Sequence, residues 1–196
     1  MLEGMDGSGK STQCRMLSDR LDQNNVPYIS LREPGGTETS ELIRKWLSVG
    51  SDIDPITELF LLEAARSSLI HQQITPSLNS NKFIILDRFI YSTLAYQGFA
   101  RGIEMSLIDQ VNEIATRGLT PNKVFLMDLE PDVSIKRLVE KTKDRWESEN
   151  LIFHASVRNG YIKLAQQNPG LWKIVDASRS AEEVHEYIWK YVKSLF

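Results

Sequence analysis

Cysteine is almost absent from this chain, because Cys14 is the only one among 196 residues. An internal disulfide is therefore impossible, which fits a reducing, cytoplasmic compartment. We expect Cys14 to be a small buried residue of the first helix. Long hydrophobic runs are lacking too, so no segment is expected to cross a membrane. A net charge of −3, spread along the chain, gives no reason to expect nucleic acid or a membrane as a partner.

Repeats and low-complexity tracts are also lacking, and the length suits one domain over residues 1–196. What the chain does contain is a glycine-rich segment, Gly4-Met5-Asp6-Gly7-Ser8-Gly9-Lys10-Ser11-Thr12. It matches the pattern G-x-x-x-x-G-K-[ST], in which glycines let successive backbone N–H groups converge on a phosphate. In this pattern Lys10 reaches the β- and γ-phosphate oxygens and Ser11 ligates Mg²⁺. The segment predicts a nucleotide triphosphate site.

The pattern should follow a strand and open a helix. Met16, Leu17 and Leu21 recur at helical spacing after it, which predicts that helix. Only Met1, Leu2 and Glu3 precede Gly4, whereas a core strand usually has about five or six residues. We therefore expect the natural strand to begin before Met1.

Short apolar runs alternate with longer amphipathic stretches along the rest of the chain. The runs at 27–31, 82–87, 123–128 and 172–176 are typical of a parallel sheet that is covered on both faces. Helices are predicted at 38–47, 55–78, 106–117, 132–140, 151–167 and 181–195. With the first strand, this alternation predicts an α/β fold with a doubly wound, parallel five-stranded sheet and helices on both faces. Ligands of such sheets bind beyond the carboxyl ends of the strands.

Two polar segments follow strands and so lie at that edge. Arg32-Glu33-Pro34-Gly35-Gly36-Thr37 follows the second strand, and its Pro-Gly-Gly run is also ordinary turn chemistry. Asp87-Arg88 follows the third strand. A carboxylate at this place commonly reaches the metal of a phosphate-binding loop, and a guanidinium binds phosphate with two hydrogen bonds. The alternative for Asp87-Arg88 is a purely structural ion pair.

Together the segments EGMDGSGKSTQ, REPGGT, DRFIYSTLAYQG, DRWE and VDASRSAEEV resemble, in order and approximate spacing, bacterial thymidylate kinase. The resemblance covers nearly the whole chain. It implies a nucleoside-monophosphate kinase of the P-loop type with a small lid at about residues 137–150. The implied reaction transfers a phosphoryl group from ATP to dTMP with Mg²⁺, in dTTP synthesis for DNA replication. The resemblance also implies a homodimer, with an interface at 55–78 and 106–117.

The resemblance also implies roles for single residues around the phosphates. Lys10 and Arg88 bind phosphate groups, Asp6 faces the acceptor sugar, and Asp87 lies near the metal held by Ser11. The implied catalytic residues are Lys10, Asp6, Asp87, Arg88 and Arg145. The implied ATP site comprises Gly4, Met5, Asp6, Gly7, Ser8, Gly9, Lys10, Ser11, Thr12 and Arg137, and the 176–180 segment lies along the adenine.

For the acceptor dTMP, the resemblance assigns the thymine edge to Ser92 and Thr93 and the sugar 2′ position to the ring of Tyr96. Gln97 belongs to the same loop. The other implied acceptor residues are Glu33, Pro34, Arg44, Leu62 and Arg66. Leu62 departs from the family, which usually has a phenylalanine there to stack on thymine, so we expect weaker stacking or another ring. Phe60 is expected to be a core residue, and Trp146, Trp172 and Trp189 are expected to serve packing.

A basic residue is required on the migrating phosphoryl group, because an arginine there contributes about three to five orders of magnitude in kcat. Residues 5–8 contain none, so the chain resembles those family members that carry the base in the lid. Arg145 is the expected cation, with Lys141 and Lys143 assisting and Arg137 nearer the adenine. Without the resemblance, a solvated helix explains this mixed-charge run equally well.

Three other functions remain open from the sequence. The first is a P-loop kinase of another nucleoside monophosphate, which Thr93 and Tyr96 would distinguish. The second is a guanine-nucleotide switch, but neither Asn81-Lys82 nor Asn122-Lys123 is followed by the aspartate of an N-K-x-D box. The third is an inactive binding protein, against which the intact phosphate-binding residues argue.

Overall fold

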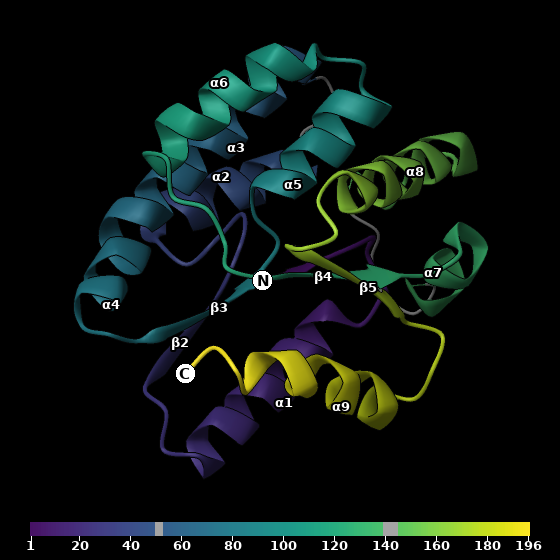
Figure 1. Cartoon of the computed structure of the whole chain (residues 1–196). Coiled ribbons are helices and arrows are strands. Elements are labelled where there is room, and N and C mark those ends of the chain that lie inside the picture. The colour runs from purple at the N-terminus through teal and green to yellow at the C-terminus, as the bar shows by residue number, and fades with distance from the viewer. Residues whose placement is uncertain (50–52, 139–144) are drawn as a thin grey trace.

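The computed structural model describes residues 1–49, 53–138 and 145–196. Its centre is a parallel five-stranded sheet in the order β2-β3-β1-β4-β5. Helices α1 and α9 cover one face, and α3, α6 and α8 lie on the other (Figure 1). The predicted doubly wound α/β fold is confirmed. Among the described residues, no helix is long and apolar enough to cross a membrane.

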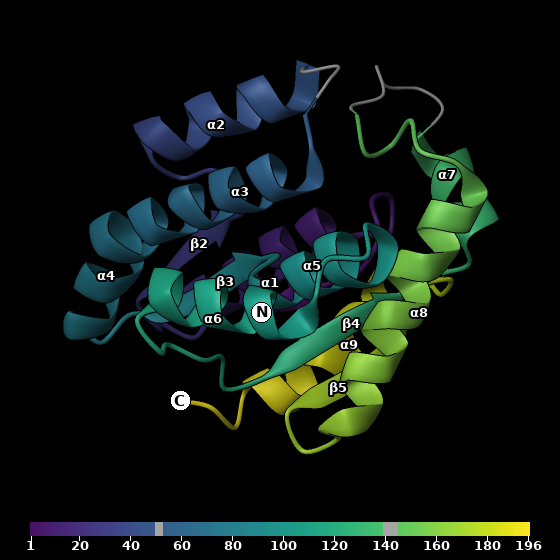
Figure 2. The same ribbon diagram turned by 90° about the horizontal axis from the view of Figure 1, so that it is seen from above.

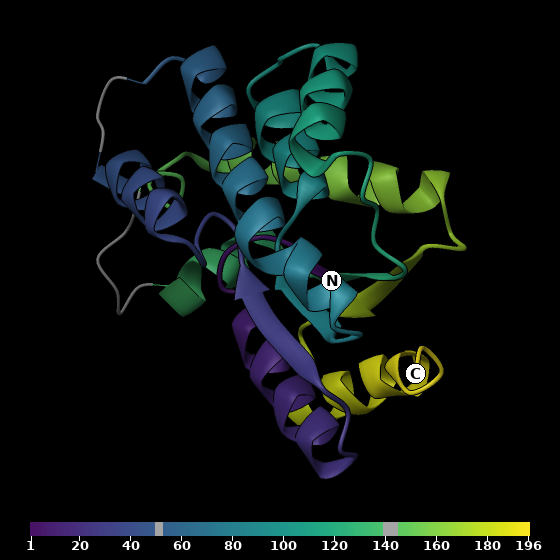
Figure 3. The same ribbon diagram turned by 90° about the vertical axis from the view of Figure 1, so that its left-hand side faces the viewer.

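The elements follow one another as strand and helix along most of the chain. Seen from above, α8 lies at the β4–β5 end of the sheet (Figure 2). Strand β2 forms the opposite edge and faces the viewer in Figure 3. The bounds are β1 Leu2–Glu3, α1 Lys10–Gln23, β2 Tyr28–Arg32, α2 Glu38–Val49, α3 Pro55–Leu69, η1 Ile70–Ile74, α4 Thr75–Asn79, β3 Phe83–Asp87, α5 Ile90–Thr93, η2 Leu94–Ala100, α6 Met105–Thr116, β4 Val124–Asp128, α7 Pro131–Leu138, α8 Leu151–Gln167, β5 Trp172–Asp176 and α9 Ala181–Val192.

Local sequence explains where the helices begin. The side chain of Asp54 accepts hydrogen bonds from the first backbone N–H groups of α3, and Pro55 takes the first helical position, where no N–H is needed. Ser180 and Glu183 form a reciprocal capping box at the start of α9. Such caps fix the helix starts to within a residue of the predicted ones.

Two expectations from the sequence were wrong. The segment 90–100 is helical, as α5 followed by the π-helical η2, so Gln97 lies on a helix rather than in a loop. Its β-branched and aromatic residues and Gly98 are poor helix formers, and packing against α8 stabilises it instead. Phe60 is 55% exposed and therefore not a core residue. Trp146 packs against the core as expected and also lines a cavity, described below, and Trp172 and Trp189 are buried as expected.

The core consists of apolar layers on both sides of the sheet. Leu17, Leu21 and Ile188 belong to the layer beneath it, with Cys14 buried among them as expected. Burial raises the pKa of the Cys14 thiol to about 12, so the thiol stays protonated and unreactive at neutral pH. These layers hold the sheet rigidly, and the loops at its carboxyl edge carry the polar residues.

Candidate functional site

The glycine-rich segment forms a tight loop between β1 and α1. Gly4 has φ +138°, and a Cβ there would lie 2.6 Å from the carbonyl oxygen of Met127. Gly9 has φ +93° and directly precedes α1. Only glycine adopts such backbone angles without strain, so both positions require it. The loop therefore presents backbone N–H groups and the N-terminus of α1 on one side, as a phosphate site requires.

Lys10 folds back onto this loop. Its Nζ donates hydrogen bonds to the carbonyl oxygens of Gly4 at 3.0 Å and Met5 at 2.7 Å, and the side chain is buried. Burial and the charge of Arg88 lower the pKa of Lys10. Gly4 and Met5 thus lie beneath the loop and serve it through their carbonyl groups.

Ser11 and Asp87 meet at the end of β3. The Ser11 Oγ donates a hydrogen bond of 2.6 Å to Asp87 Oδ2. Mg²⁺ takes oxygen ligands and typically uses one or two protein side chains together with substrate phosphates. A hydroxyl and a carboxylate side by side next to a phosphate-binding loop fit that donor set.

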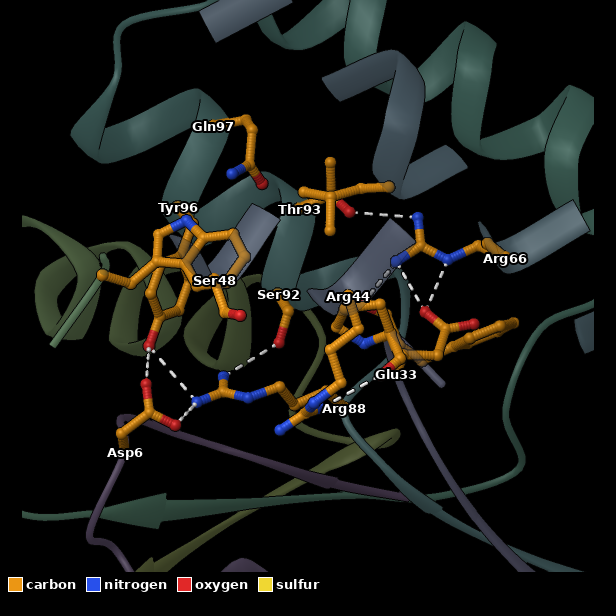
Figure 4. A pocket seen from close by; sticks show the side chains of 14 residues that line it. Asp6, Glu33, Arg44, Ser48, Arg66, Arg88, Ser92, Thr93, Tyr96 and Gln97 are labelled. Carbon is orange, nitrogen blue, oxygen red and sulfur yellow. Dashed lines mark hydrogen bonds and ion pairs between the residues drawn. The ribbon is translucent and has the colours of Figure 1, made fainter. Parts of the chain in front are cut away.

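Arg88 extends from the end of β3 into the cleft. Its φ is +71°, an uncommon conformation for a residue with a side chain, which is often found at functional sites. Its Nη2 donates hydrogen bonds to Asp6 at 2.6 Å and to the Tyr96 hydroxyl at 3.3 Å, while Nη1 reaches Ser92 at 3.2 Å (Figure 4). Three predicted acceptor residues therefore gather around one guanidinium.

The charged groups in this cluster strongly shift each other's pKa values. Burial alone would raise the pKa of Asp6, but the positive charges of Arg88 and Lys10 outweigh it and hold that pKa well below its usual range. Asp6 is therefore ionised at neutral pH and balances the charge of Arg88. An anionic ligand with several oxygens is able to replace Asp6 as the partner of the guanidinium.

Two residues beneath this cluster were missed by sequence reasoning. Glu3 is fully buried and accepts hydrogen bonds from the Phe89 N–H at 2.9 Å, the Ser92 hydroxyl at 2.7 Å and the Tyr161 hydroxyl at 2.9 Å. Burial raises the pKa of Glu3. A carboxylate in a central strand was itself a signal, because a buried acid needs hydrogen-bond partners. Glu3 and Tyr161 fix the backbone and side chains around Arg88.

Three adjoining cavities follow the carboxyl edge of the sheet. Cavity A, of about 390 Å³, lies under α2 and α3. Cavity B, of about 400 Å³, lies over the glycine-rich loop and shares Asp6, Glu33, Arg44 and Arg88 with cavity A. Cavity C, of about 340 Å³, continues from cavity B past Gly7 and Arg137 toward Ala177. The arrangement resembles two ligand sites that meet at Asp6 and Arg88.

The residues predicted for the acceptor all line cavity A. They are Asp6, Glu33, Pro34, Arg44, Leu62, Arg66, Arg88, Ser92, Thr93, Tyr96 and Gln97, and Ser48, Phe89 and Trp146 complete the wall. Those predicted for the triphosphate, apart from Gly4 and Met5, line cavities B or C. The Nη1 of Arg137 donates a hydrogen bond to the Ala177 carbonyl at 3.2 Å, beside cavity C.

Arg66 is a buried hub in the wall of cavity A. Its guanidinium forms an ion pair with Glu33 at 2.7 Å and donates hydrogen bonds to Thr93 at 3.0 Å and Asn112 at 2.6 Å. It also pairs with Glu63. Figure 4 shows Arg66 between Glu33 and Thr93. Because its three nitrogens all have protein partners, Arg66 acts here by holding Glu33 and Thr93 in place.

Arg145 is not brought to the phosphate side. It forms an ion pair with the fully buried Glu58, whose other oxygen accepts a hydrogen bond of 2.6 Å from Gln97. Arg101 lies 3.7 Å from the same carboxylate. Arg145 lines none of cavities A, B and C. The other expected lid cations, Lys141 and Lys143, lie outside the described residues.

The fold and the site define a class of protein. A parallel sheet in this order, a phosphate-binding loop after β1 and a second anion site after β3 are features of a P-loop nucleotide kinase. The sequence matches the thymidylate kinase family over residues 2–188. The chain therefore belongs to the thymidylate kinase family and is an enzyme.

Individual relatives agree with this assignment. The chain is 43% identical to a thymidylate kinase of Symbiobacterium thermophilum, over 98% of this chain and 91% of that protein. It is 39% identical to a thymidylate kinase of Kosmotoga olearia, over 96% of this chain and 91% of that protein. The solved thymidylate kinase of Ehrlichia chaffeensis superimposes with a TM-score of 0.79 at 33% identity, covering 97% of this chain and 95% of that one.

Proposed function

We propose that the chain transfers the γ-phosphoryl group of ATP to dTMP and so forms dTDP for dTTP synthesis. The observation that carries this proposal is the Arg88–Asp6 ion pair at the junction of cavities A and B. A guanidinium at that place holds the acceptor phosphate in line with a triphosphate on the glycine-rich loop. Positioning and charge neutralisation dominate phosphoryl transfer, so the acceptor phosphate needs no strong general base.

On the donor side, the backbone of residues 6–12 holds the phosphates of ATP, while Gly4 and Met5 support the loop from beneath. Lys10 turns from the loop carbonyls to the β- and γ-phosphates. Arg137 and the backbone around Ala177 border the adenine in cavity C. Ser11 and Asp87 would hold Mg²⁺ there, which neutralises the charge of the phosphates when bound. The two oxygens that would ligate the ion are Ser11 Oγ and Asp87 Oδ2, which lie 2.6 Å apart.

On the acceptor side, the phosphate of dTMP takes the place of Asp6 on Arg88, and Asp6 turns to the sugar. Thr93, held by Arg66, faces the thymine edge. Tyr96 restricts the space for a 2′-hydroxyl, because its hydroxyl accepts the Arg88 bond and donates one to Asp6 at 3.2 Å. Catalysis is thus assigned to Lys10, Asp6, Asp87 and Arg88, with Arg145 as the additional cation.

Arg145 has two separable roles, as a partner of Glu58 or as a cation on the migrating phosphoryl group. Arg145→Ala tests them against Arg101→Ala, because Arg101 shares Glu58 but has no assigned part in the transfer. We expect Arg145→Ala to lower kcat at least 100-fold with the KM for dTMP nearly unchanged. Equal effects of both substitutions on kcat would remove the catalytic role.

The proposal also covers the compartment, the domain organisation and the oligomeric state of the enzyme. We place it in the cytoplasm as a single domain, acting as a homodimer through residues 55–78 and 106–117. We place its lid at about 137–150, of which residues 139–144 lie outside the described residues. The exposure of Phe60 at 55% and Ile114 at 76% supports that dimer. Light scattering of the purified protein tests it, and Phe60→Asp should shift a dimer toward the monomer.

The central experiment is an acceptor panel with ATP and Mg²⁺, using dTMP, dUMP, dCMP, dGMP and UMP. We expect dTMP to have the highest kcat/KM and UMP to be far poorer than dUMP. Preference for another nucleotide would favour the alternative kinase, and inactivity with every acceptor would favour a binding protein.

Arg88→Ala tests the observation on which the proposal rests. Two charge-assisted hydrogen bonds to a phosphate contribute roughly 3–5 kcal/mol, so kcat/KM for dTMP should fall about 150- to 4,000-fold. Arg158→Ala is the matched control, because Arg158 pairs with Asp128 and Glu130 and lines none of cavities A, B and C. A similar loss in both variants would contradict the role of Arg88.

A further inference from the structure

The glycine-rich loop contains a tight turn over residues 5–8. The Ser8 N–H donates a hydrogen bond of 3.3 Å to the Met5 carbonyl, and Gly7 has φ +77°. The described residues with a positive φ do not include Asp6. A positive φ at the third residue of a turn, and not at the second, defines a type II turn. The peptide group between Asp6 and Gly7 is therefore the central peptide of this turn.

The direction of that central peptide decides what the loop presents to a ligand. Type I and type II turns differ by a reversal of the central peptide, while the path of the chain is nearly the same. Because this peptide is trans, its C=O and N–H groups point in opposite directions. Gly7 lines cavities B and C, and no acceptor for its N–H is found among the described residues. The N–H faces the cavities when the Asp6 carbonyl points away from them.

Ser134 of α7 holds the Asp6 carbonyl in that direction. Its hydroxyl donates a hydrogen bond to the Asp6 oxygen, and its side chain is 3% exposed. Ser134 lines none of cavities A, B and C, so this bond draws the carbonyl away from the cavities. The Gly7 N–H is thereby directed to the side on which we place the phosphates of ATP.

The Ser134 contact is unusual for a serine inside a helix. The hydroxyl of a helical serine can bond back to the carbonyl four residues earlier. Ser18 of α1 does so, at 3.0 Å from the Cys14 oxygen. Ser156 of α8 does so at 2.9 Å from the Ile152 oxygen. The Ser134 hydroxyl instead leaves its own helix and bonds to a residue 128 positions away, so it serves the loop.

Arg137 makes a second contact from α7 to the same turn. It follows Ser134 by three residues, and residues at this spacing lie on one face of a helix. Its Nη1 donates a long hydrogen bond, of 3.5 Å, to the Gly7 carbonyl. One face of α7 thus reaches two consecutive carbonyl groups of the loop. The buried hydroxyl of Ser134 is the more specific of the two contacts, because Arg137 is exposed.

We propose that Ser134 is a positioning residue for the phosphates of the donor nucleotide. It holds the central peptide of the turn in the type II direction, so that the Gly7 N–H donates to a phosphate oxygen. Without the hydroxyl the peptide reverses more readily, which hides this N–H and turns a carbonyl oxygen toward the phosphates. The inference rests on the proposed function only in that the loop holds the phosphates of ATP.

The experiment measures the binding of ADP and of AMP to the full chain by calorimetry. The loop holds the β-phosphate, which AMP lacks, so only ADP should respond to Ser134→Ala. We expect the dissociation constant of ADP to rise about tenfold and that of AMP to change by less than about twofold. An unchanged constant for ADP, or equal rises for ADP and AMP, overturns the proposal.

Two further variants control this measurement. Ser156→Ala removes a hydroxyl that bonds within its own helix, so it should leave both constants unchanged. Ser134→Thr keeps the hydroxyl and should recover most of the ADP affinity. A Ser134→Thr protein with an unchanged Tm but the ADP affinity of Ser134→Ala would also overturn the proposal. Neither ligand is the acceptor, so failure of the acceptor panel leaves this test intact. An unmodified protein that does not bind ADP would overturn this inference and the proposed function together.

Discussion

Glu33 is the group whose replacement tests the electrostatics of cavity A most directly. Its carboxylate is buried, with Oε2 paired to Arg66 at 2.7 Å and Oε1 without a partner among the described residues. Glu63 binds the same guanidinium, so two carboxylates share one positive charge. Burial raises the pKa of Glu33 to about 7, against the attraction of Arg66, and the negative charge of Glu63 adds to the rise.

The sign of the effect on stability follows from this shift. Between pH 4.5 and 7 the folded protein keeps a proton on Glu33 that the unfolded chain has lost, so stability falls as pH rises. A shift of this size corresponds to about 3 kcal/mol at most. Glu33→Gln removes the titration while keeping the size of the side chain. Relative to the unmodified protein, the variant should therefore gain about 5–10 °C in Tm between pH 5 and pH 8.

Thermal unfolding from pH 5 to pH 8, at fixed ionic strength, measures this difference. Glu38→Gln is the control for the lost charge, because Glu38 is exposed in the first turn of α2. We expect its Tm to stay parallel to that of the unmodified protein. A parallel curve for Glu33→Gln would refute the reasoning, and a relative loss on raising the pH would show that Arg66 stabilises the charged form.

The remaining predictions concern packing and the thymine site. Leu62→Phe should lower the KM for dTMP several-fold by adding a stacking ring, unless Trp146, which lines the same cavity, already supplies one; steady-state kinetics with Leu62→Phe and Trp146→Leu separate the two. Gly160→Ala should lower Tm by several degrees, because the new Cβ would lie 2.6 Å from the ring of Phe99. Asn159→Ala, at an exposed neighbouring position, should not. A stabilised Gly160→Ala would contradict the close packing of α8 on η2.

Much of the fold was predictable because its signals are local. The apolar runs gave the four five-residue strands, and Ser180 with Glu183 marked the start of α9. The short β1 was visible as a lack of residues before Gly4, and the expectation that its natural strand begins before Met1 stays a prediction. The helical segment 90–100 was not predictable, because tertiary contacts with α8 override its weak helix propensity.

The site, too, has residues that the sequence predicted and residues that it did not. Motif residues such as Asp6 and Arg88 meet as expected, because parallel strands bring their carboxyl ends to one edge. The residues that support this pair were missed: Glu3 was marked only by its charge in a central strand, and its partner Tyr161 is far away in the sequence and reaches it only in the folded chain. The pairing of Arg145 with Glu58 depends equally on long-range packing, which no spacing in the sequence encodes.

The ion pair of Asp6 and Arg88 means that, before any ligand binds, the guanidinium that we assign to the acceptor phosphate already has a carboxylate partner. A thymidine that lacks a phosphate brings nothing that competes with the aspartate, so the nucleoside should be a poor ligand even where the base fits. On the proposed assignment, the Asp6 carboxylate occupies the phosphate position on Arg88 until a ligand with negatively charged oxygens of its own replaces it. A nucleotide and a nucleoside would then be distinguished at the binding step, before phosphoryl transfer.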